Sequence, residues 1–542
     1  MKSFIALVVD DDPEILVQAK EAFPANPSSF LFTARSFKDA LEIIRNEFLH
    51  AAFVDLVLDP RRAKNPDGLE ILSTLAKLRP SCKRFLLTKD MMSTSSHRDA
   101  FFDLLNPAEP IIHGAIDKQN FDTNFADVLK DLCSQWLAGQ VEVSDCAEVL
   151  AALTEKGVVE PESTRVTSEE IDYLVSRLLG QGKRRPNPTE DDVDRICLSY
   201  LSKGRSQSVV MLGRPCNRAG QQGIYCVIKV GWRSDAMQES YRYQTYVRFL
   251  MSLNRRVELL DFIQGDALGL VCYSFGGPSP ESVCSLGDLF DREDFRAVNV
   301  IDELFPPESK EFYAREQKAR DIGRFFSTTY GFNAGRARDA VDRFAERIAP
   351  AIGGYKEGNT LRVGGDALTL PMDVLGAGSF RTEYQACIIH GDLNAENVIV
   401  ANDNRVICID YRYTGWGPRT LDFAALQASV RLSSPVLART VKEIVDDHRV
   451  EMEVWESAWS GKEGSEALPD SSPYWARVSH RLLRKLGENF ADESPQAHAS
   501  TCLLLALRLL YGRSWADEAR LRLLVWMSSL TRFWREYQEK KQ

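Results

Sequence analysis

The sequence predicts a multidomain protein of the α/β and α+β classes, in which a doubly wound parallel sheet precedes a two-lobed part that ends in helices. Three observations support this fold class. The chain has 542 residues, which is too long for one ordinary core. Residues 1–138 alternate between short apolar runs and amphipathic runs, whereas residues 194–277 are rich in strands. Residues 421–542 have helical periodicity throughout.

The composition is that of a globular protein without a nucleic-acid partner. Its 67 Lys and Arg residues stand against 77 Asp and Glu residues, which gives a net charge of −10, and no long basic stripe interrupts the pattern. The cysteines are scattered without a C-x-x-C pair, as is typical of reduced thiols in the cytosol. No apolar run reaches membrane-spanning length. We therefore expect a cytoplasmic protein with no membrane partner.

The first 138 residues have the alternation of a parallel sheet covered by helices on both faces. In such a sheet the functional site lies beyond the carboxyl ends of the strands. The expected strands are 4–9, 31–34, 51–58, 83–88 and 111–116, and the expected helices are 13–23, 37–48, 67–78, 96–105 and 125–137.

Polar residues close four of these strands. Asp10 and Asp11 follow the first strand, Asp55 lies in the third, Thr88 ends the fourth and Lys118 follows the fifth. Clustered carboxylates suit Mg²⁺, and a lysine and a hydroxyl nearby would stabilise a phosphoryl group on the third carboxylate. Strand-end acids that cap helices are the structural alternative, which explains any one of these residues but not the whole set.

This set resembles the receiver domain of two-component response regulators over nearly all of residues 1–138. The resemblance implies that Asp10 and Asp11 hold Mg²⁺ and that Asp55 accepts the phosphoryl group. It also implies that Thr88 and Lys118 contact that group as the receiver switch. A histidine kinase or another phosphodonor is the implied partner.

The sequence departs from the receiver pattern in ways that concern the switch. The loop after Asp55 is longer than usual before its Asp-Gly pair, and Asp59 adds a carboxylate to it. Gln119 stands where a proline usually follows the lysine. Ala115 stands where many receivers have an aromatic residue that moves on activation. The residues that the resemblance assigns to the phosphoryl chemistry are all present, whereas these departures concern the usual switch mechanism.

Residues 139–193 are expected to form a helical connector, with helices at 144–157 and 167–180 and a Pro-rich, charged end. Strands are expected next at 195–203, 208–215, 223–231, 257–263 and 267–275, with one helix at 235–253. Lys229 lies in an apolar strand, where an unpaired lysine is costly, and Glu239 on the helix is its candidate partner. A strand-edge lysine that reaches solvent is the alternative. The turn around Gly204 could cover phosphates, although a single glycine is a weak signal.

The stretch 387–413, "CIIHGDLNAENVIVANDNRVICIDYRY", is the most informative in the chain. It reads as a loop, a strand, a turn and a second strand that ends at Asp410. Phosphoryl transfer needs a carboxylate to orient the attacking hydroxyl and oxygen ligands for Mg²⁺ on the nucleotide. Asp392 suits the first role, and Asn397 and Asp410 suit the second. His390 is counted with the catalytic residues and is expected to brace the loop by hydrogen bonds. For the stretch as a whole, a hairpin with polar loop residues is the alternative.

The segment resembles the aminoglycoside/choline phosphotransferase branch of the protein-kinase-like superfamily, with coverage of about residues 195–530. The resemblance implies a bilobal kinase-like fold, with a small lobe at 194–277 and a large lobe with a helical acceptor subdomain at 278–542. It implies that Asp392 is the catalytic base and that Asn397 and Asp410 bind metal. Lys229 and Glu239 become the nucleotide pair, and Asp422 becomes a structural support of the loop. ATP and Mg²⁺ are the implied cofactors.

Together these patterns predict a bacterial cytoplasmic phosphotransferase that uses ATP and Mg²⁺ and is regulated by the fused receiver. The expected acceptor is a hydroxyl of an unidentified protein or small molecule. Two alternatives stay open. The first is a nucleotide-binding pseudokinase that serves as a signalling output or scaffold. The second is an aminoglycoside-type small-molecule kinase in which the receiver is only a docking domain.

Overall fold

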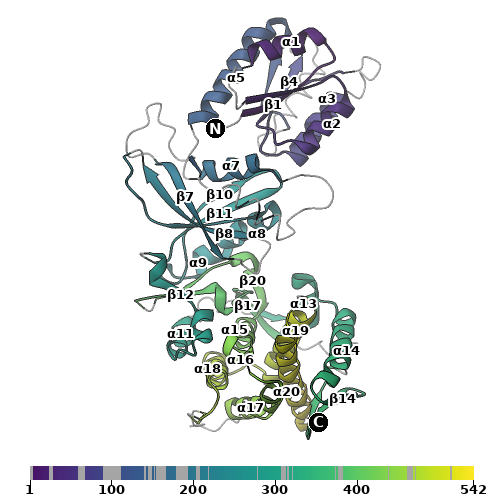
Figure 1. The fold of residues 1–542 in the computed structure, drawn as a ribbon, viewed down its shortest axis with the longest axis vertical. Coiled ribbons are helices and arrows are strands. Elements are labelled where there is room, and N and C mark those ends of the chain that lie inside the picture. Colours follow the sequence, from purple (N-terminus) through teal and green to yellow (C-terminus); the bar gives the residue numbers. More distant parts are fainter. Residues whose placement is uncertain are drawn as a thin grey trace. The chain divides into compact units, whose positions relative to one another are not determined.

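The computed structural model divides the chain into two compact units, which are taken separately below (Figure 1). The first holds residues 1–240 and 258–275, and the second holds residues 241–257 and 276–542. The structure describes residues 4–23, 29–58, 67–88, 111–138, 142–143, 149, 151, 153, 166–178, 193–202, 208–217, 219–277, 279–306, 313, 317–319, 321–372, 374–375, 383–403, 405–437, 439–459, 468–469, 471–512 and 515–541.

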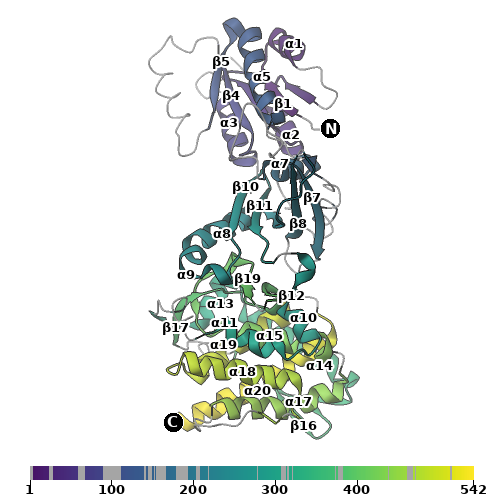
Figure 2. The same cartoon turned by 90° about the vertical axis from the view of Figure 1, so that its left-hand side faces the viewer.

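The first unit begins with a five-stranded parallel sheet in the order β2-β1-β3-β4-β5. Apolar residues from α2 and α3 fill the core on one face, and residues from α1 and α5 fill the core on the other (Figure 2). This doubly wound arrangement confirms the predicted receiver-type fold. The strands are β1 (Phe4–Val9), β2 (Ser29–Ala34), β3 (Ala51–Asp55), β4 (Lys83–Thr88) and β5 (Gly114–Asp117), and the helices are α1 (Pro13–Ala22), α2 (Phe37–Asn46), α3 (Asp67–Leu78) and α5 (Phe121–Ala138).

A second sheet of six strands follows, in the order β10-β11-β9-β8-β7-β6. All its neighbours are antiparallel except β6 and β7. Helix α8 (Arg233–Arg242) follows β9 directly and continues as a π-helical turn at Tyr243–Val247. The strands are β6 (Glu142–Val143), β7 (Val193–Ser202), β8 (Val209–Asn217), β9 (Cys226–Trp232), β10 (Leu259–Gln264) and β11 (Leu268–Ser274).

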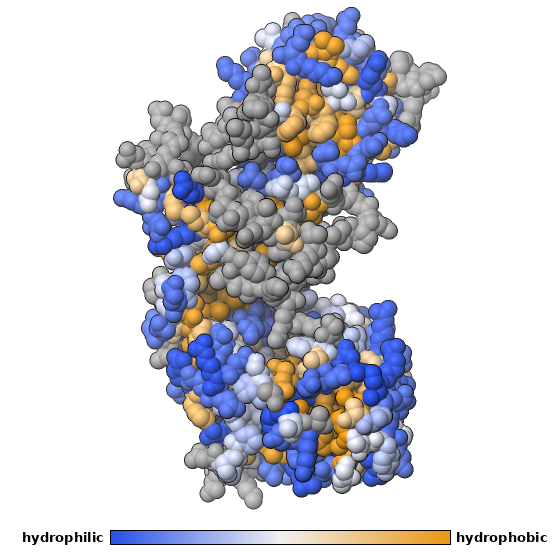
Figure 3. All heavy atoms as spheres, in the orientation of Figure 1, coloured by the Kyte–Doolittle hydropathy of each residue, from blue (hydrophilic) through white to orange (hydrophobic). Residues whose placement is uncertain are grey.

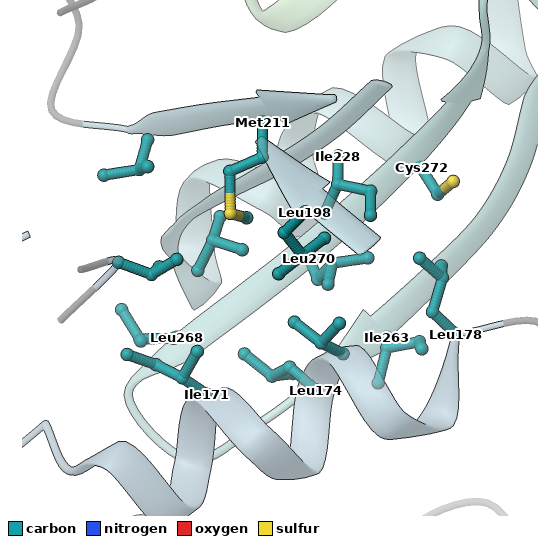
Figure 4. Packing of buried hydrophobic residues seen from close by; sticks show 14 of the residues in the cluster. Ile171, Leu174, Leu178, Leu198, Met211, Ile228, Ile263, Leu268, Leu270 and Cys272 are labelled. Atoms are coloured by element: carbon teal, nitrogen blue, oxygen red, sulfur yellow. The ribbon is translucent and has the colours of Figure 1, made fainter. Parts of the chain in front are cut away.

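The expected connector contributes to the core of this second sheet. Helix α7 (Ser168–Arg177) begins at the cap Thr167, whose hydroxyl accepts a hydrogen bond from the Glu170 amide. Its buried residues Ile171 and Leu174 face apolar side chains of the sheet (Figure 4). Residues 149 and 153 pack into the same cluster. The predicted domain boundaries stay predictions, but α7 and the sheet share one core.

The second unit combines short strands with a helical C-terminal part, which agrees with the predicted kinase-like fold. Two small sheets frame the segment around residue 392, in the orders β12-β18-β19 and β13-β17-β20. The strands are β12 (Val283–Ser285), β13 (Gln317–Ala319), β17 (Tyr384–Ile389), β18 (Val398–Ala401), β19 (Val406–Cys408) and β20 (Gly415–Pro418). The helices are α10 (Leu286–Asp291), α11 (Arg296–Leu304), α13 (Ile322–Tyr330), α14 (Ala334–Ala351), α15 (Leu421–Arg431), α16 (Ser434–Leu437), α17 (Val441–Trp459), α18 (Tyr474–Asn489), α19 (Pro495–Gly512) and α20 (Asp517–Lys541).

Several elements differ from the sequence-based expectation. A meander of β14 (Gly354–Glu357), β15 (Thr360–Val363) and β16 (Asp366–Thr369) was not predicted. Strand β20 was not predicted either, because its sequence Gly-Trp-Gly-Pro has no apolar alternation. Strand β5 starts at Gly114 instead of residue 111. The expected helix at 96–105, together with Asp59 and Gly204, lies outside the described residues.

Two facts concern the polarity of the chain. Hydrophilic side chains cover most of the second unit on the face drawn in Figure 3, with a smaller apolar patch between them. Among the described residues, no helix is both long and apolar enough to cross a bilayer.

Candidate active site

The receiver region brings its acidic residues together at one edge of the parallel sheet. Ligand atoms of Asp10, Asp11 and Asp55 all lie within 4.8 Å of one another. The Nζ atom of Lys118 lies 2.8 Å from Asp10 Oδ2 and 2.8 Å from Asp55 Oδ1. One ammonium among three carboxylates leaves an excess of negative charge, which fits a hard divalent cation such as Mg²⁺. Asp12, the neighbour of this group, instead caps α1 through the Glu14 amide.

The backbone around Asp55 is closely packed. A Cβ atom on Gly68 would stand 2.0 Å from the carbonyl oxygen of Asp55, so only glycine allows α3 to start here. Thr88 ends β4, and its register partner on β5 is Asp117. Ala115, the missing switch aromatic, pairs in register with Leu86. All the described receiver residues singled out from the sequence therefore lie on the strand ends where they were expected, and their roles stay predictions.

Burial shapes the electrostatics of this edge. It raises the pKa of Asp55 to about 6, and the hydrogen bond and charge of Lys118 offset only part of that rise. Burial also raises the pKa of Asp10. The pKa of Lys118 is raised because the two carboxylates outweigh the effect of its own burial. A cation at this edge competes with a proton for Asp55.

We expect the Mg²⁺ affinity of the receiver site to fall when the pH is lowered from about 8 to about 5, because Asp55 takes up a proton around its raised pKa. Calorimetry with Mg²⁺ in the absence of nucleotide measures this directly. The matched control is Asp55→Asn, which cannot titrate and should flatten the pH dependence. Equal affinity at both pH values in the unmodified protein would contradict the expectation.

The second sheet carries the lysine and glutamate singled out from the sequence. Lys229 on β9 donates from Nζ to Glu239 Oε2 on α8, at 2.8 Å, and both side chains are nearly buried. The other oxygen, Glu239 Oε1, accepts a hydrogen bond of 2.8 Å from the hydroxyl of Tyr273 on β11. Glu239 is thus held from two strands. Tyr273 was not predicted, although a tyrosine in a mostly apolar strand is a usable signal.

The loop after β17 is held by a buried carboxylate. Asp422, at the start of α15, accepts hydrogen bonds from the backbone amides of His390 and Gly391, both at 2.9 Å. It also accepts one from the hydroxyl of Tyr313, at 3.2 Å. Gly391 has φ 83°, and a Cβ atom there would stand 2.3 Å from the Tyr413 carbonyl oxygen, so this position requires glycine. The structure therefore places Asp422 where the resemblance implied a support for the loop.

His390 connects the loop to the next strand. Its ring Nε2 donates to the carbonyl oxygen of Ile409 at 3.0 Å, and its side chain is 1 % exposed. The ring lies against Tyr411, with ring centroids 5.4 Å apart. The ring therefore connects the loop to the strand that precedes Asp410, and its bracing role stays a prediction.

Asp392, Asn397 and Asp410 form the other polar group. Asn397 donates from its side-chain amide to the backbone carbonyl oxygen of Asp392 at 2.8 Å. The backbone carbonyl oxygen of Asn397 accepts a hydrogen bond from the Ile409 amide at 3.0 Å. Because its nitrogen is used in this way, the side-chain oxygen of Asn397 is left for a cation. Asp410 lies two residues past the end of β19, in the left-handed region with φ 65°. The sequence pattern predicts Asp410 at the strand end itself, whereas β19 ends two residues earlier, at Cys408.

The Asp410 carboxylate affects the pKa of Asp392. Burial raises the pKa of Asp392, and the nearby Asp410 carboxylate raises it further. Two close carboxylates beside an amide oxygen form a donor set of the kind that Mg²⁺ binds. A carboxylate with a raised pKa is also a stronger proton acceptor than an ordinary aspartate.

Comparison with known protein families adds a finding for this segment. Residues 367–455 match the model of the phosphotransferase enzyme family. The matched residues include the loop, Asp410 and Asp422. No curated protein matches the chain.

Solved structures similar to parts of the chain fall into two groups. A CheY-like receiver domain protein from Methanospirillum hungatei JF-1 is 24% identical, with a TM-score of 0.21, over 26% of this chain and 100% of its own. A thermostable mutant of aminoglycoside phosphotransferase APH(4)-Ia is 12% identical, with a TM-score of 0.30, over 62% and 94%. An ethanolamine kinase from Plasmodium vivax is 11% identical, with a TM-score of 0.32, over 71% and 95%.

The segment that matches the family model also has neighbours that the sequence pattern did not predict. The hydroxyl of Tyr330 donates to the Gly391 carbonyl oxygen at 2.6 Å. The guanidinium of Arg508, on α19, lies 4.4 Å from the centroid of the Tyr330 ring, and its charge lowers the pKa of Asp392 against the larger effect of burial. A lone arginine in the apolar run 502–510 was the available signal. Asp392 thus has a cation nearby as well as a second carboxylate.

Proposed function

We propose that this protein is a bacterial cytoplasmic phosphotransferase that uses ATP and Mg²⁺, and that the fused receiver regulates it. It transfers the γ-phosphoryl group of ATP to a hydroxyl of a protein or small-molecule acceptor. The observation that carries the proposal is the loop fixed by Asp422, which puts Asp392 beside Asn397 and Asp410. The match of residues 367–455 to the phosphotransferase family supports it.

Each residue has a defined part in the proposed reaction. Asp392 accepts the proton of the acceptor hydroxyl as its oxygen bonds to the γ-phosphorus, and the bond from that phosphorus to the bridging oxygen breaks, releasing ADP. Asn397 and Asp410 would hold Mg²⁺, which neutralises charge on the phosphates when bound. Lys229 is kept by Glu239 in a fixed position from which an ammonium binds nucleotide phosphates.

The receiver site has a corresponding part in the proposal. Asp55 accepts a phosphoryl group from a histidine kinase or another phosphodonor, with Asp10 and Asp11 holding Mg²⁺. Thr88 and Lys118 then contact the new phosphoryl oxygens. The added charge shifts the balance of the buried ion pairs that Lys118 makes with Asp10 and Asp55.

The two alternatives make different demands on the same residues. A pseudokinase needs no proton acceptor, whereas Asp392 lies with the proposed metal ligands and burial raises its pKa. An aminoglycoside-type kinase would use the same catalytic residues, so only the acceptor that takes the label separates it from a kinase with another hydroxyl acceptor. We therefore favour an active enzyme over a pseudokinase.

The test is incubation of the purified protein with γ-labelled ATP and a bacterial lysate, followed by separation of protein and small-molecule fractions. The proposal expects the label in a phosphate ester, formed on a hydroxyl of a molecule in one of these fractions. Binding of Mg-ATP without transfer to any fraction would favour the pseudokinase. In a parallel incubation a purified aminoglycoside replaces the lysate, and transfer to that aminoglycoside would favour the small-molecule alternative.

A further inference from the structure

The receiver region and the second sheet meet inside the first unit at a buried polar joint. Asp266, in the turn between β10 and β11, accepts hydrogen bonds from the Ser81 hydroxyl at 2.6 Å and the Ser81 amide at 3.2 Å. Arg79 lies 3.4 Å from its other oxygen, and both side chains of this ion pair are fully buried. We call Arg79, Ser81, Asp266 and Glu170 the Asp266 joint.

Glu170 holds the same turn from the side of α7. Its Oε1 accepts hydrogen bonds from the backbone amides of Ala267 at 2.7 Å and Leu268 at 2.9 Å. A Cβ atom on Gly265 would stand 2.6 Å from this oxygen, so the turn is pressed against the glutamate. A buried turn whose amides are satisfied by one side chain has little freedom to move independently of it.

On the receiver side, the joint lies at the amino ends of the strands that lead to the phosphoryl site. Arg79 donates from Nε to the Ile44 carbonyl oxygen at 2.7 Å, which ties it to the end of α2. Strand β4 begins two residues after Ser81 and ends at Thr88. Strand β3 begins just after Phe48, whose ring lies 5.5 Å from that of Tyr173 on α7, and it ends at Asp55. Strand β4 therefore runs from the joint to the candidate switch, and β3 runs there from the contact with α7, the helix that carries Glu170.

On the other side, the joint leads to the candidate nucleotide pair. The amide of Arg233, the first residue of α8, donates to the Ala267 carbonyl oxygen at 2.9 Å. A Cβ atom on Gly269 would stand 2.7 Å from the side chain of Ala236, so β11 and α8 are in close contact. Strand β11 then runs from this turn to Tyr273, which holds Glu239.

We propose that the Asp266 joint is the element through which the receiver sets the position of α8 and hence of the Lys229–Glu239 pair. The inference deepens the proposed function, on which it rests, by assigning the route of regulation. A buried ion pair flanked by satisfied hydrogen bonds resists partial displacement, because removing one partner leaves a charge without compensation. A shift of β3 or β4 is therefore passed to the turn as a whole and from there to the start of α8.

Arg79, Ser81 and Asp266 are positioning residues in this proposal, and none of them belongs to the proposed nucleotide or metal sites. The test measures Mg-ATP affinity by calorimetry, with and without beryllofluoride at Asp55, in the full chain. We expect beryllofluoride to change the affinity of the unmodified protein by at least about fivefold, the lower end of usual allosteric couplings. Asp266→Asn and the milder Ser81→Ala should remove most of that change. Asp127→Asn, an exposed residue on α5, is the matched control and should retain it.

Hydrogen exchange supplies a readout that does not depend on nucleotide. In Ser81→Ala and Asp266→Asn, we expect faster exchange of the amides in the first turn of α8, starting with Arg233, while the amides of β9 stay protected. An intact beryllofluoride response in both variants would overturn the proposal, as would an unmodified protein whose affinity never responds. If beryllofluoride changes the Mg-ATP affinity and the joint variants remove that change, the proposed role of the joint is supported even when no phosphoryl transfer is found. In that case only the proposed catalysis fails.

Discussion

Replacement of Asp392 by asparagine is expected to lower phosphoryl transfer by at least about a hundredfold, the effect of losing a general base. The side chain keeps its size, and the loop is fixed by contacts that this residue's carboxylate does not make. The amides of His390 and Gly391 stay bound to Asp422, and the side-chain amide of Asn397 donates to the backbone carbonyl of Asp392. Binding of Mg-ATP should therefore persist while turnover falls.

The matched control is Asp403→Asn. Asp403 lies exposed in the turn between β18 and β19, where it pairs with Arg405 outside the site. This variant should keep the unmodified rate of transfer from labelled ATP. If Asp392→Asn transfers at the same rate as the control, Asp392 is not the base and another group must accept the proton.

Replacement of Asp410 should remove nucleotide binding that depends on Mg²⁺. Its backbone has φ 65°, a conformation that asparagine tolerates and alanine does not, so Asp410→Asn tests the charge without adding strain. We expect Mg-ATP affinity to fall by at least about tenfold, which corresponds to about 1.4 kcal/mol. Asp410→Ala should abolish it, because the ligand is lost and the backbone is strained as well.

The pKa of Asp392 provides a second readout for the same variant. The Asp410 carboxylate raises that pKa, so its neutralisation should move the acidic limb of the pH–rate profile to lower pH. The residual transfer rate of Asp410→Asn at high Mg-ATP concentration gives this profile. Calorimetry that finds unchanged Mg-ATP affinity would assign the metal to other oxygens and remove Asp410 from the proposed set.

The receiver-type sheet could be predicted because its signals are local. Its strands contain apolar runs and its helices are amphipathic, which predicts a parallel sheet covered by helices, whereas the order of the strands comes from the structure. The β14–β16 meander was missed because its strands are short and half polar. Gly358 and Gly364, with φ 56° and 59°, mark its two turns and were the signal that could have found it.

The candidate site also contains residues that could be predicted from the sequence and residues that could not. Asp392, Asn397 and Asp410 lie within one short stretch, so their spacing was visible in the sequence. Tyr330 and Arg508 come from helices far apart in the chain, and a single sequence does not show that they meet near Asp392. The Asp266 joint was hidden for the same reason, since Ser81 and Asp266 are separated by 185 residues.

The most direct test of a receiver-regulated phosphotransferase is the initial rate of transfer from γ-labelled ATP, measured with and without beryllofluoride. The comparison uses the unmodified protein, Asp55→Asn and Asp392→Asn. We predict that beryllofluoride changes the rate only where Asp55 is present, and that Asp392→Asn is close to inactive in both conditions. A rate that is the same in all of these proteins, or that never responds to beryllofluoride, would contradict the account.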